Sequence, residues 1–102
     1  MVMLGAGQVW SLRDCSSLAA VHAIETLGDD DIVHVSILDS NGGVRVGHTP
    51  FARLAFLRSI KHVVTKAEPE ADFHEGYAYW RSEFEKGAAG IYDIDVCEAL
   101  NL

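Results

Sequence analysis

Long apolar runs are missing from this sequence. Each uninterrupted apolar segment is much shorter than the roughly 20 residues that a helix needs to cross a bilayer, so we expect no membrane-spanning segment. The first ten residues, MVMLGAGQVW, also lack the basic region and the long apolar region of a secretory signal. We therefore expect a cytoplasmic protein that does not bind a membrane and forms a single domain over residues 1–102. Whether residues 1–8 are ordered or disordered stays open.

Cysteine is scarce and has no metal-binding spacing. Cys15 and Cys97 are the only two, they lie far apart in the sequence, and neither belongs to a C-x-x-C pair. This pattern indicates neither a disulfide framework nor a zinc ribbon. Because both residues have apolar neighbours, we expect buried free thiols in a reducing compartment, in agreement with a cytoplasmic location.

Catalytic and metal-binding motifs are also missing. Neighbouring histidines are 12 to 14 residues apart, so a metal site would need ligands from separate elements, of which His34, Asp93 and Asp95 are the best combination. No serine lies in a G-x-S-x-G motif, and the G-A-G near the N-terminus does not follow a strand. We expect no metal, no cofactor and no catalytic residue, which favours a protein that is not an enzyme without deciding the matter. The five histidines are His22, His34, His48, His62 and His74.

Acidic residues are absent from one long window of an otherwise acidic chain. The net charge is −7, which disfavours binding to nucleic acid or to an anionic membrane. Between positions 40 and 67 there is no Asp or Glu, so one part of the surface is expected to be basic and the rest acidic. The positive charges of this window are Arg45, Arg53, Arg58, Lys61 and Lys66.

A β-hairpin is the clearest local prediction. Residues 32–38 (IVHVSIL) and 44–47 (VRVG) have strand character, and Asn41, Gly42 and Gly43 favour a two-residue turn between them. That turn would put Val44 and Val46 on the same face as Val33, Val35 and Ile37. The opposite face would carry His34, Ser36 and Arg45 and be partly exposed.

Helices are expected on both sides of this hairpin. Asp14 as a cap and Gly28 as a stop predict a helix over 15–27, after a weak strand over 9–13. Thr49 and Pro50 predict the start of a helix that extends to position 66. Further segments are a helix over 69–86, a strand over 90–95 and a short terminal helix to position 102, with Asp95 and Glu98 in a capping-box pattern.

The resulting order, β-α-β-β-α-α-β-α, predicts an α+β fold. We expect a mainly antiparallel sheet of three or four strands with helices packed on one face. A ferredoxin-like arrangement is one version of this fold.

The helix over 69–86 carries an aromatic stripe. Its four residues recur at the spacing i, i+4, i+7 and i+11, which places them on one helical face. Such a face is typical of a core or of a subunit interface, and less often of a ligand platform. The residues are Phe73, Tyr77, Trp80 and Phe84.

An anion site is predicted at the expected helix start near position 49. Free N–H groups there, together with His48, Thr49 and Arg53, would suit a carboxylate or a phosphate group. The alternative is that Arg53 pairs with an acidic side chain of the same chain, such as Asp39.

The sequence favours a small interaction or assembly module over an enzyme. A surplus aromatic face predicts a homo-oligomer, specifically a dimer, and the separated charges suit a second protein as partner. The alternative function is the binding or conversion of a small anionic ligand near residues 47–53.

Overall fold

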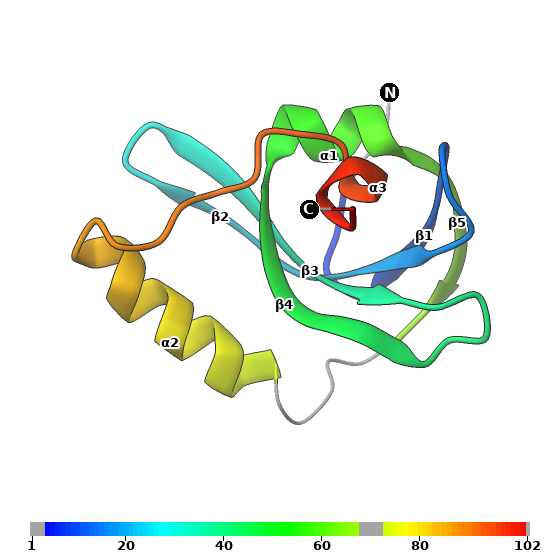
Figure 1. Cartoon of the computed structure of the whole chain (residues 1–102), viewed down its shortest axis with the longest axis horizontal. Coiled ribbons are helices and arrows are strands. Elements are labelled where there is room, and N and C mark those ends of the chain that lie inside the picture. Colours follow the sequence, from blue (N-terminus) through cyan, green and yellow to red (C-terminus); the bar gives the residue numbers. More distant parts are fainter. Residues whose placement is uncertain (1–3, 68–72, 102) are drawn as a thin grey trace.

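The computed structural model describes residues 4–67 and 73–101. It is an α+β fold built on one five-stranded antiparallel sheet with the strand order β4-β3-β2-β1-β5 (Figure 1). The α+β class is thus confirmed, but the sheet has five strands instead of three or four, and the element order differs from that of a ferredoxin-like domain. The elements are β1 (Gln8–Leu12), β2 (Leu18–Leu27), β3 (Asp30–Leu38), β4 (Val44–Ala52), α1 (Arg53–Ser59), β5 (Ile60–Lys66), α2 (Phe73–Glu85) and α3 (Val96–Ala99).

The first four strands follow one another, each antiparallel to its neighbour. Helix α1 then carries the chain from β4 at one edge of the sheet to the opposite edge, where β5 pairs with β1. Figure 1 shows that the sheet is strongly curved, with α1 and α3 over its open side and α2 outside the curve. The sheet therefore has a concave face that α1 and α3 close and a convex face that α2 approaches.

The predicted helix over 15–27 is wrong, because residues 18–27 form strand β2. Ala19 and Val21 point into the concave core, while Ala20 belongs to a smaller apolar cluster on the other side. With both faces covered, the strand lacks the alternation of polar and apolar residues that identifies a half-exposed strand. Its alanines favour a helix by intrinsic propensity, and pairing with β1 and β3 overrides that preference.

The predicted helix from Thr49 to position 66 is also wrong. Thr49 and Pro50 lie in β4, and the helical part is limited to the seven residues of α1. Proline is tolerated here because β4 is an edge strand and needs no N–H for a further neighbour. Residues 61–66, expected on a helix, form an exposed strand at the other edge.

The hairpin between β3 and β4 has a longer connection than the two residues predicted. Residues 39–43 join the strands, and the Asp39 carboxylate accepts hydrogen bonds from the N–H groups of Asn41 and Gly43. Gly42 adopts φ 91°, which suits glycine. The register shifts beside the turn, so that Val46 pairs with Ile37 and Val44 with Leu38, and both valines are exposed. Because directly opposite residues of an antiparallel pair share a face, the predicted face is confirmed for Val46, which lies beside Ile37, and is wrong for Val44, which lies with Leu38 on the other face.

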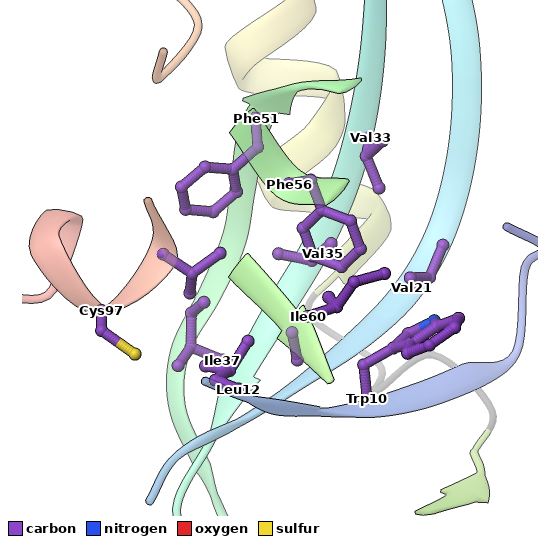
Figure 2. Packing of buried hydrophobic residues seen from close by; sticks show 12 residues of the cluster. Trp10, Leu12, Val21, Val33, Val35, Ile37, Phe51, Phe56, Ile60 and Cys97 are labelled. Carbon is purple, nitrogen blue, oxygen red and sulfur yellow. The ribbon is translucent and has the colours of Figure 1, made fainter. Parts of the chain in front are cut away.

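The main core fills the concave side of the sheet. Figure 2 shows Val33, Val35 and Ile37 of β3 facing Phe56 of α1 and Phe51 of β4. Trp10, Leu12, Val21 and Ile60 complete the side chains labelled there, and Val96 with Cys97 brings α3 onto the cluster.

The cysteines form a disulfide, so the expectation of free thiols is wrong. Cys15 and Cys97 are 82 positions apart, and their Cα atoms lie 5.9 Å from each other. This pairing could not be predicted from the sequence, because neither the spacing of the two cysteines nor their neighbouring residues indicate that the fold brings them together. The disulfide ties α3 to the segment between β1 and β2.

The predictions for the chain ends are confirmed in part. Strand β1 exists as expected, α2 replaces the longer predicted helix, and residues 69–72 of that prediction lie outside the described residues, as do 1–3 and 102. In place of a strand over 90–95 there is a single parallel bridge between Tyr92 and Phe51. Helix α3 forms with Asp95 at its cap, although the Asp95 side chain makes no capping hydrogen bond. No helix within residues 4–67 and 73–101 is long and apolar enough to cross a membrane.

Candidate functional site: a histidine chain beside a cleft

Helix α2 covers polar residues on the convex face of the sheet. His34 and Ser36 of β3, which we expected on a partly exposed face, are both 0% exposed. A buried polar group is costly unless it is hydrogen-bonded, so the partners of these residues matter. His22 of β2 lies 3.0 Å from Ser36, measured from Nε2 to Oγ.

His34 is the centre of a chain of short hydrogen bonds. Its Nε2 lies 2.6 Å from Oε1 of Glu25, and its Nδ1 lies 2.8 Å from Nε2 of His48. The rings of His34 and His48 are stacked, with centroids 4.9 Å apart. Three strands therefore contribute one residue each: Glu25 from β2, His34 from β3 and His48 from β4.

Helix α2 extends this chain at the glutamate end. The Tyr77 hydroxyl donates to Oε1 of Glu25 at 2.8 Å and accepts from Nη1 of Arg81 at 3.0 Å. Arg81 also lies 3.6 Å from Oε2 of Glu25 and donates through Nε to Glu85 at 2.9 Å. We call the five residues Arg81, Tyr77, Glu25, His34 and His48 the histidine chain.

The aromatic stripe of α2 packs on these histidines. Edges of Tyr77 and Trp80 meet His34 at centroid distances of 4.9 and 5.0 Å, and Phe73 meets His22 at 4.4 Å. Phe73 and Trp80 are only 4% and 7% exposed. Within one copy of the chain, this packing favours the core alternative for Phe73 and Trp80 over the interface alternative. Phe84 stacks on Trp80 at 4.8 Å.

Burial sets the charge state of the histidines. Burial, followed by the proximity of His34, lowers the pKa of His48 to about 4, although Glu25 acts in the opposite direction. Burial also lowers the pKa of His34 in spite of its hydrogen bond to Glu25. Both rings are therefore neutral at pH 7. The pKa of the Tyr77 hydroxyl is raised by burial and by its bond to Glu25.

His48 lies in the wall of a cleft. The cleft has a volume of about 790 Å³ and lies between β4, α2 and residues 88–92. The Trp80 indole N–H donates to the carbonyl of Gly90 at 3.0 Å, and Tyr92 exchanges backbone hydrogen bonds with Pro50 and Ala52, so the third wall is attached to the other two. Its lining includes His48, Thr49, Pro50, Gly76, Tyr79, Trp80, Glu83, Ile91 and Tyr92.

Gly76 allows α2 to lie close to His48. A Cβ atom built on Gly76 would be 3.1 Å from the Cβ of His48, closer than most such contacts in proteins. Close packing of α2 on β4 therefore favours glycine at this position, although glycine has a poor helix propensity.

The residues of the predicted anion site do not meet in one place. No helix starts at Thr49, and His48 and Thr49 line the cleft beside Trp80. Arg53 begins α1 and lines a different hollow, together with Asp29, Asp30, Asp31 and Asp93. The helix terminus on which the prediction rested is thus absent at that point.

The metal combination considered from sequence also does not form. Both ring nitrogens of His34 are engaged by Glu25 and His48, and Asp95 lies 3.3 Å from Arg58. Among residues 4–67 and 73–101, no three His, Cys, Asp or Glu side chains are grouped so as to hold a metal ion.

Sequence reasoning missed Glu25 and Tyr77 as partners of a histidine. The register of β2 against β3 shifts between Val21 and Ala23, which puts Ala23 opposite His34 and Glu25 opposite Ile32. Two residues that regular alternation would assign to opposite faces, His22 and Glu25, thereby both reach the convex side.

Comparison of the chain with protein-family models, curated proteins and solved structures found no match.

Proposed function

We propose that this protein binds a small organic molecule in the cleft between β4, α2 and residues 88–92, with His48 as the central polar contact. The observation that carries this proposal is the position of His48. His48 is hydrogen-bonded to His34 of the histidine chain, and it also lines a cleft of about 790 Å³.

The composition of the cleft suits a small molecule. Aromatic and small apolar residues make up most of its walls, and the polar side chains are few: His48, Thr49 and Glu83, with the hydroxyls of Tyr79 and Tyr92. Ligand sites in proteins have volumes of about 300–1,000 Å³ and combine apolar walls with a few placed polar groups. The volume of the cleft lies within this range, and its walls have this composition.

The histidine chain is a costly feature for a purely structural contact. Replacing buried paired polar groups by well-packed apolar residues is often neutral or stabilising. A histidine whose pKa is lowered to about 4 and which lines a cleft is typical of a functional site. We therefore take the chain as a device that holds His48 neutral and oriented towards a ligand.

The proposal is tested by screening a library of small organic molecules with NMR of ¹⁵N-labelled protein. We expect binders that shift the amide signals of Gly47, Gly76 and Gly90, which line the cleft. A His48→Phe variant, in which a ring is kept but its nitrogens are lost, should bind the same molecules at least about tenfold more weakly. His62→Ala is the matched control, because His62 is exposed on β5 and should bind as wild type. If every binder shifts signals elsewhere and none shifts these glycines, the proposal is wrong.

We also propose self-association as a second function, through the exposed edges of the sheet. Strands β4 and β5 are the two outer strands, and each carries exposed valines: Val44 and Val46 at 51% and 41%, Val63 and Val64 at 45% and 51%. An edge strand with apolar side chains is a template for pairing with another chain. A dimer formed in this way would leave the aromatic stripe packed on the histidines.

Light scattering over a dilution series tests this second proposal. We expect a dimer in wild type and a monomer in Val64→Lys, with Leu54→Lys on α1 as an exposed apolar control that keeps the wild-type mass. A wild-type mass of one chain at every concentration would exclude the association.

For the compartment, the disulfide favours an oxidising environment over the expected cytoplasm.

A further inference from the structure

We infer that the cleft recognises a small organic cation that carries N–H groups, and that Glu25 is the positioning residue that makes His48 present a lone pair to it. This inference rests on the proposed ligand-binding function of the cleft and adds the class of ligand. It follows from the direction of each hydrogen bond in the histidine chain and from the charges in the cleft.

The direction of the chain is fixed at its arginine end. A guanidinium group only donates, so the Tyr77 oxygen is the acceptor of the bond from Arg81. The single hydroxyl proton of Tyr77 is then directed to Oε1 of Glu25. Glu25 therefore receives one hydrogen bond from Tyr77 and has the Arg81 guanidinium 3.6 Å from its other oxygen, which are the surroundings of an ionised carboxylate.

The direction of the remaining bonds follows from an ionised Glu25. A carboxylate only accepts, so the proton between Glu25 and His34 belongs to Nε2 of His34. Neutral His34 then has a lone pair on Nδ1, and the proton of the next bond belongs to Nε2 of His48. Neutral His48 in turn has no proton on Nδ1. Its free ring nitrogen is a hydrogen-bond acceptor and cannot donate.

The cleft complements this acceptor with negative charge and aromatic rings. Glu83 lines it and forms a long ion pair with the exposed Lys86, whose Nζ lies 3.9 Å from its Oε1. Such an exposed pair is weak, and neither Lys86 nor any other lysine or arginine lines the cleft among the residues that the structure describes. Tyr79, Trp80 and Tyr92 line it, and the rings of Tyr79 and Tyr92, which are 71% and 39% exposed, are aromatic partners that a cation can approach. The whole chain carries a net charge of −7, which draws cations towards the protein.

These features together select the ligand. An N–H donor satisfies the lone pair of His48, a positive charge is stabilised by Glu83, and an apolar body packs on the aromatic walls. An anion would meet a like charge at Glu83 and no donor at His48 Nδ1. The structure thus points to an organic ammonium compound, or one with a similar protonated nitrogen, and against the carboxylate or phosphate that the sequence indicated.

A matched set of three probes tests the ligand class. Phenethylamine, 2-phenylethanol and 3-phenylpropionate share an aromatic ring on a short chain and differ in charge. In titrations followed by the amide signals of Gly47, Gly76 and Gly90, we expect the amine to bind about tenfold more tightly than the alcohol and the carboxylate to bind most weakly. Glu83→Gln should remove most of the preference for the amine over the alcohol.

The outcomes separate this inference from the proposed function. Equal or tighter binding of the carboxylate at these glycines would overturn the inference while the cleft remained a ligand site. If none of the three probes shifts these signals, the inference is also overturned, and the wider library decides on the proposed function.

The role of Glu25 has a test that needs no ligand. In protein with ¹⁵N-labelled imidazole rings, we expect the Nδ1 signal of His48 to be that of an unprotonated nitrogen. Glu25→Gln keeps an oxygen acceptor for His34 and should preserve this tautomer, whereas Glu25→Leu removes the acceptor and should give His48 a substantial Nδ1–H population. If Glu25→Leu is not folded, the wild-type spectrum still decides, because a protonated Nδ1 there overturns the inference. An unchanged His48 tautomer in folded Glu25→Leu overturns the role of Glu25.

Discussion

Glu25 reaches His34, at 2.6 Å, from a strand whose regular alternation would have turned its side chain into the apolar core. The register shift between Val21 and Ala23 moves Glu25 to the convex face. One irregular position in β2 is thus the structural basis of the histidine chain, and a strand without it would bury a carboxylate among the core residues.

Acid should destabilise the protein through His48. Its pKa is about 4 in the folded protein and about 6.5 in an unfolded chain, so between these values the unfolded state binds more protons and stability falls as pH falls. The loss from above pH 6.5 to below pH 4 is at most about 3.5 kcal/mol, since one pKa unit corresponds to about 1.4 kcal/mol. Urea unfolding at pH 7.5 and pH 4.5 measures it.

A matched pair of variants tests whether His48 causes this pH dependence of stability. His48→Phe should lose a large part of the difference between the two pH values, while the exposed His62→Ala should keep it. The same difference in wild type and His48→Phe would show that other groups are responsible.

Gly76→Ala should fail to stabilise the protein. Alanine in a helix interior normally gains up to about 1 kcal/mol over glycine, but here the new Cβ would lie 3.1 Å from the Cβ of His48. Because that atom is held close to the backbone of β4, we expect a loss of stability and a shifted His48 ring signal. Thermal unfolding measures the first effect and NMR the second. A gain of about 1 kcal/mol would mean that α2 moves away from β4 without cost.

Removing the disulfide should strongly destabilise the fold. A cross-link between residues 82 positions apart restricts the unfolded chain, and the expected contribution is about 4 kcal/mol on the chain-entropy estimate. Cys15→Ser with Cys97→Ser should lower the unfolding free energy by roughly this amount. Adding a reductant should destabilise wild type and leave the double variant unchanged. A double variant as stable as wild type would contradict the pairing of these residues.

Replacing Trp80 by alanine should destabilise the protein far more than replacing Tyr79, although the two residues are neighbours on α2. Trp80 is 7% exposed and packs on His34, whereas Tyr79 is 71% exposed. Trp80→Ala should lower the unfolding free energy by about 3–5 kcal/mol and Tyr79→Ala by less than about 0.5 kcal/mol. Chemical denaturation of both variants checks this, and equal effects would show that Trp80 is not a core residue.

The sequence identified those features that depend on short-range signals. The strand over 32–38, the weak strand over 9–13 and the aromatic face of α2 are all observed, because alternation and helical spacing are local properties. The class α+β followed from them. The segment over 15–27 was assigned to the wrong element because its strand is covered on both faces and rich in alanine.

The candidate site depends on relationships that no local signal contains. His34 and His48 are 14 positions apart, and Tyr77 is 52 positions from Glu25. Their contact requires the bulge in β2, the placement of Thr49 and Pro50 in a strand instead of a helix, and the docking of α2 on the convex face. His48 was selected from the sequence for a different reason, as the neighbour of a helix start that does not exist.

The most direct test of this account is the ¹⁵N imidazole spectrum of wild-type protein at pH 7, recorded before any ligand is added. We predict that His48 is neutral, with its proton on Nε2 and a bare Nδ1 in the cleft. A doubly protonated His48, or a neutral ring with its proton on Nδ1, would contradict both the directed hydrogen-bond chain and the choice of ligand that follows from it.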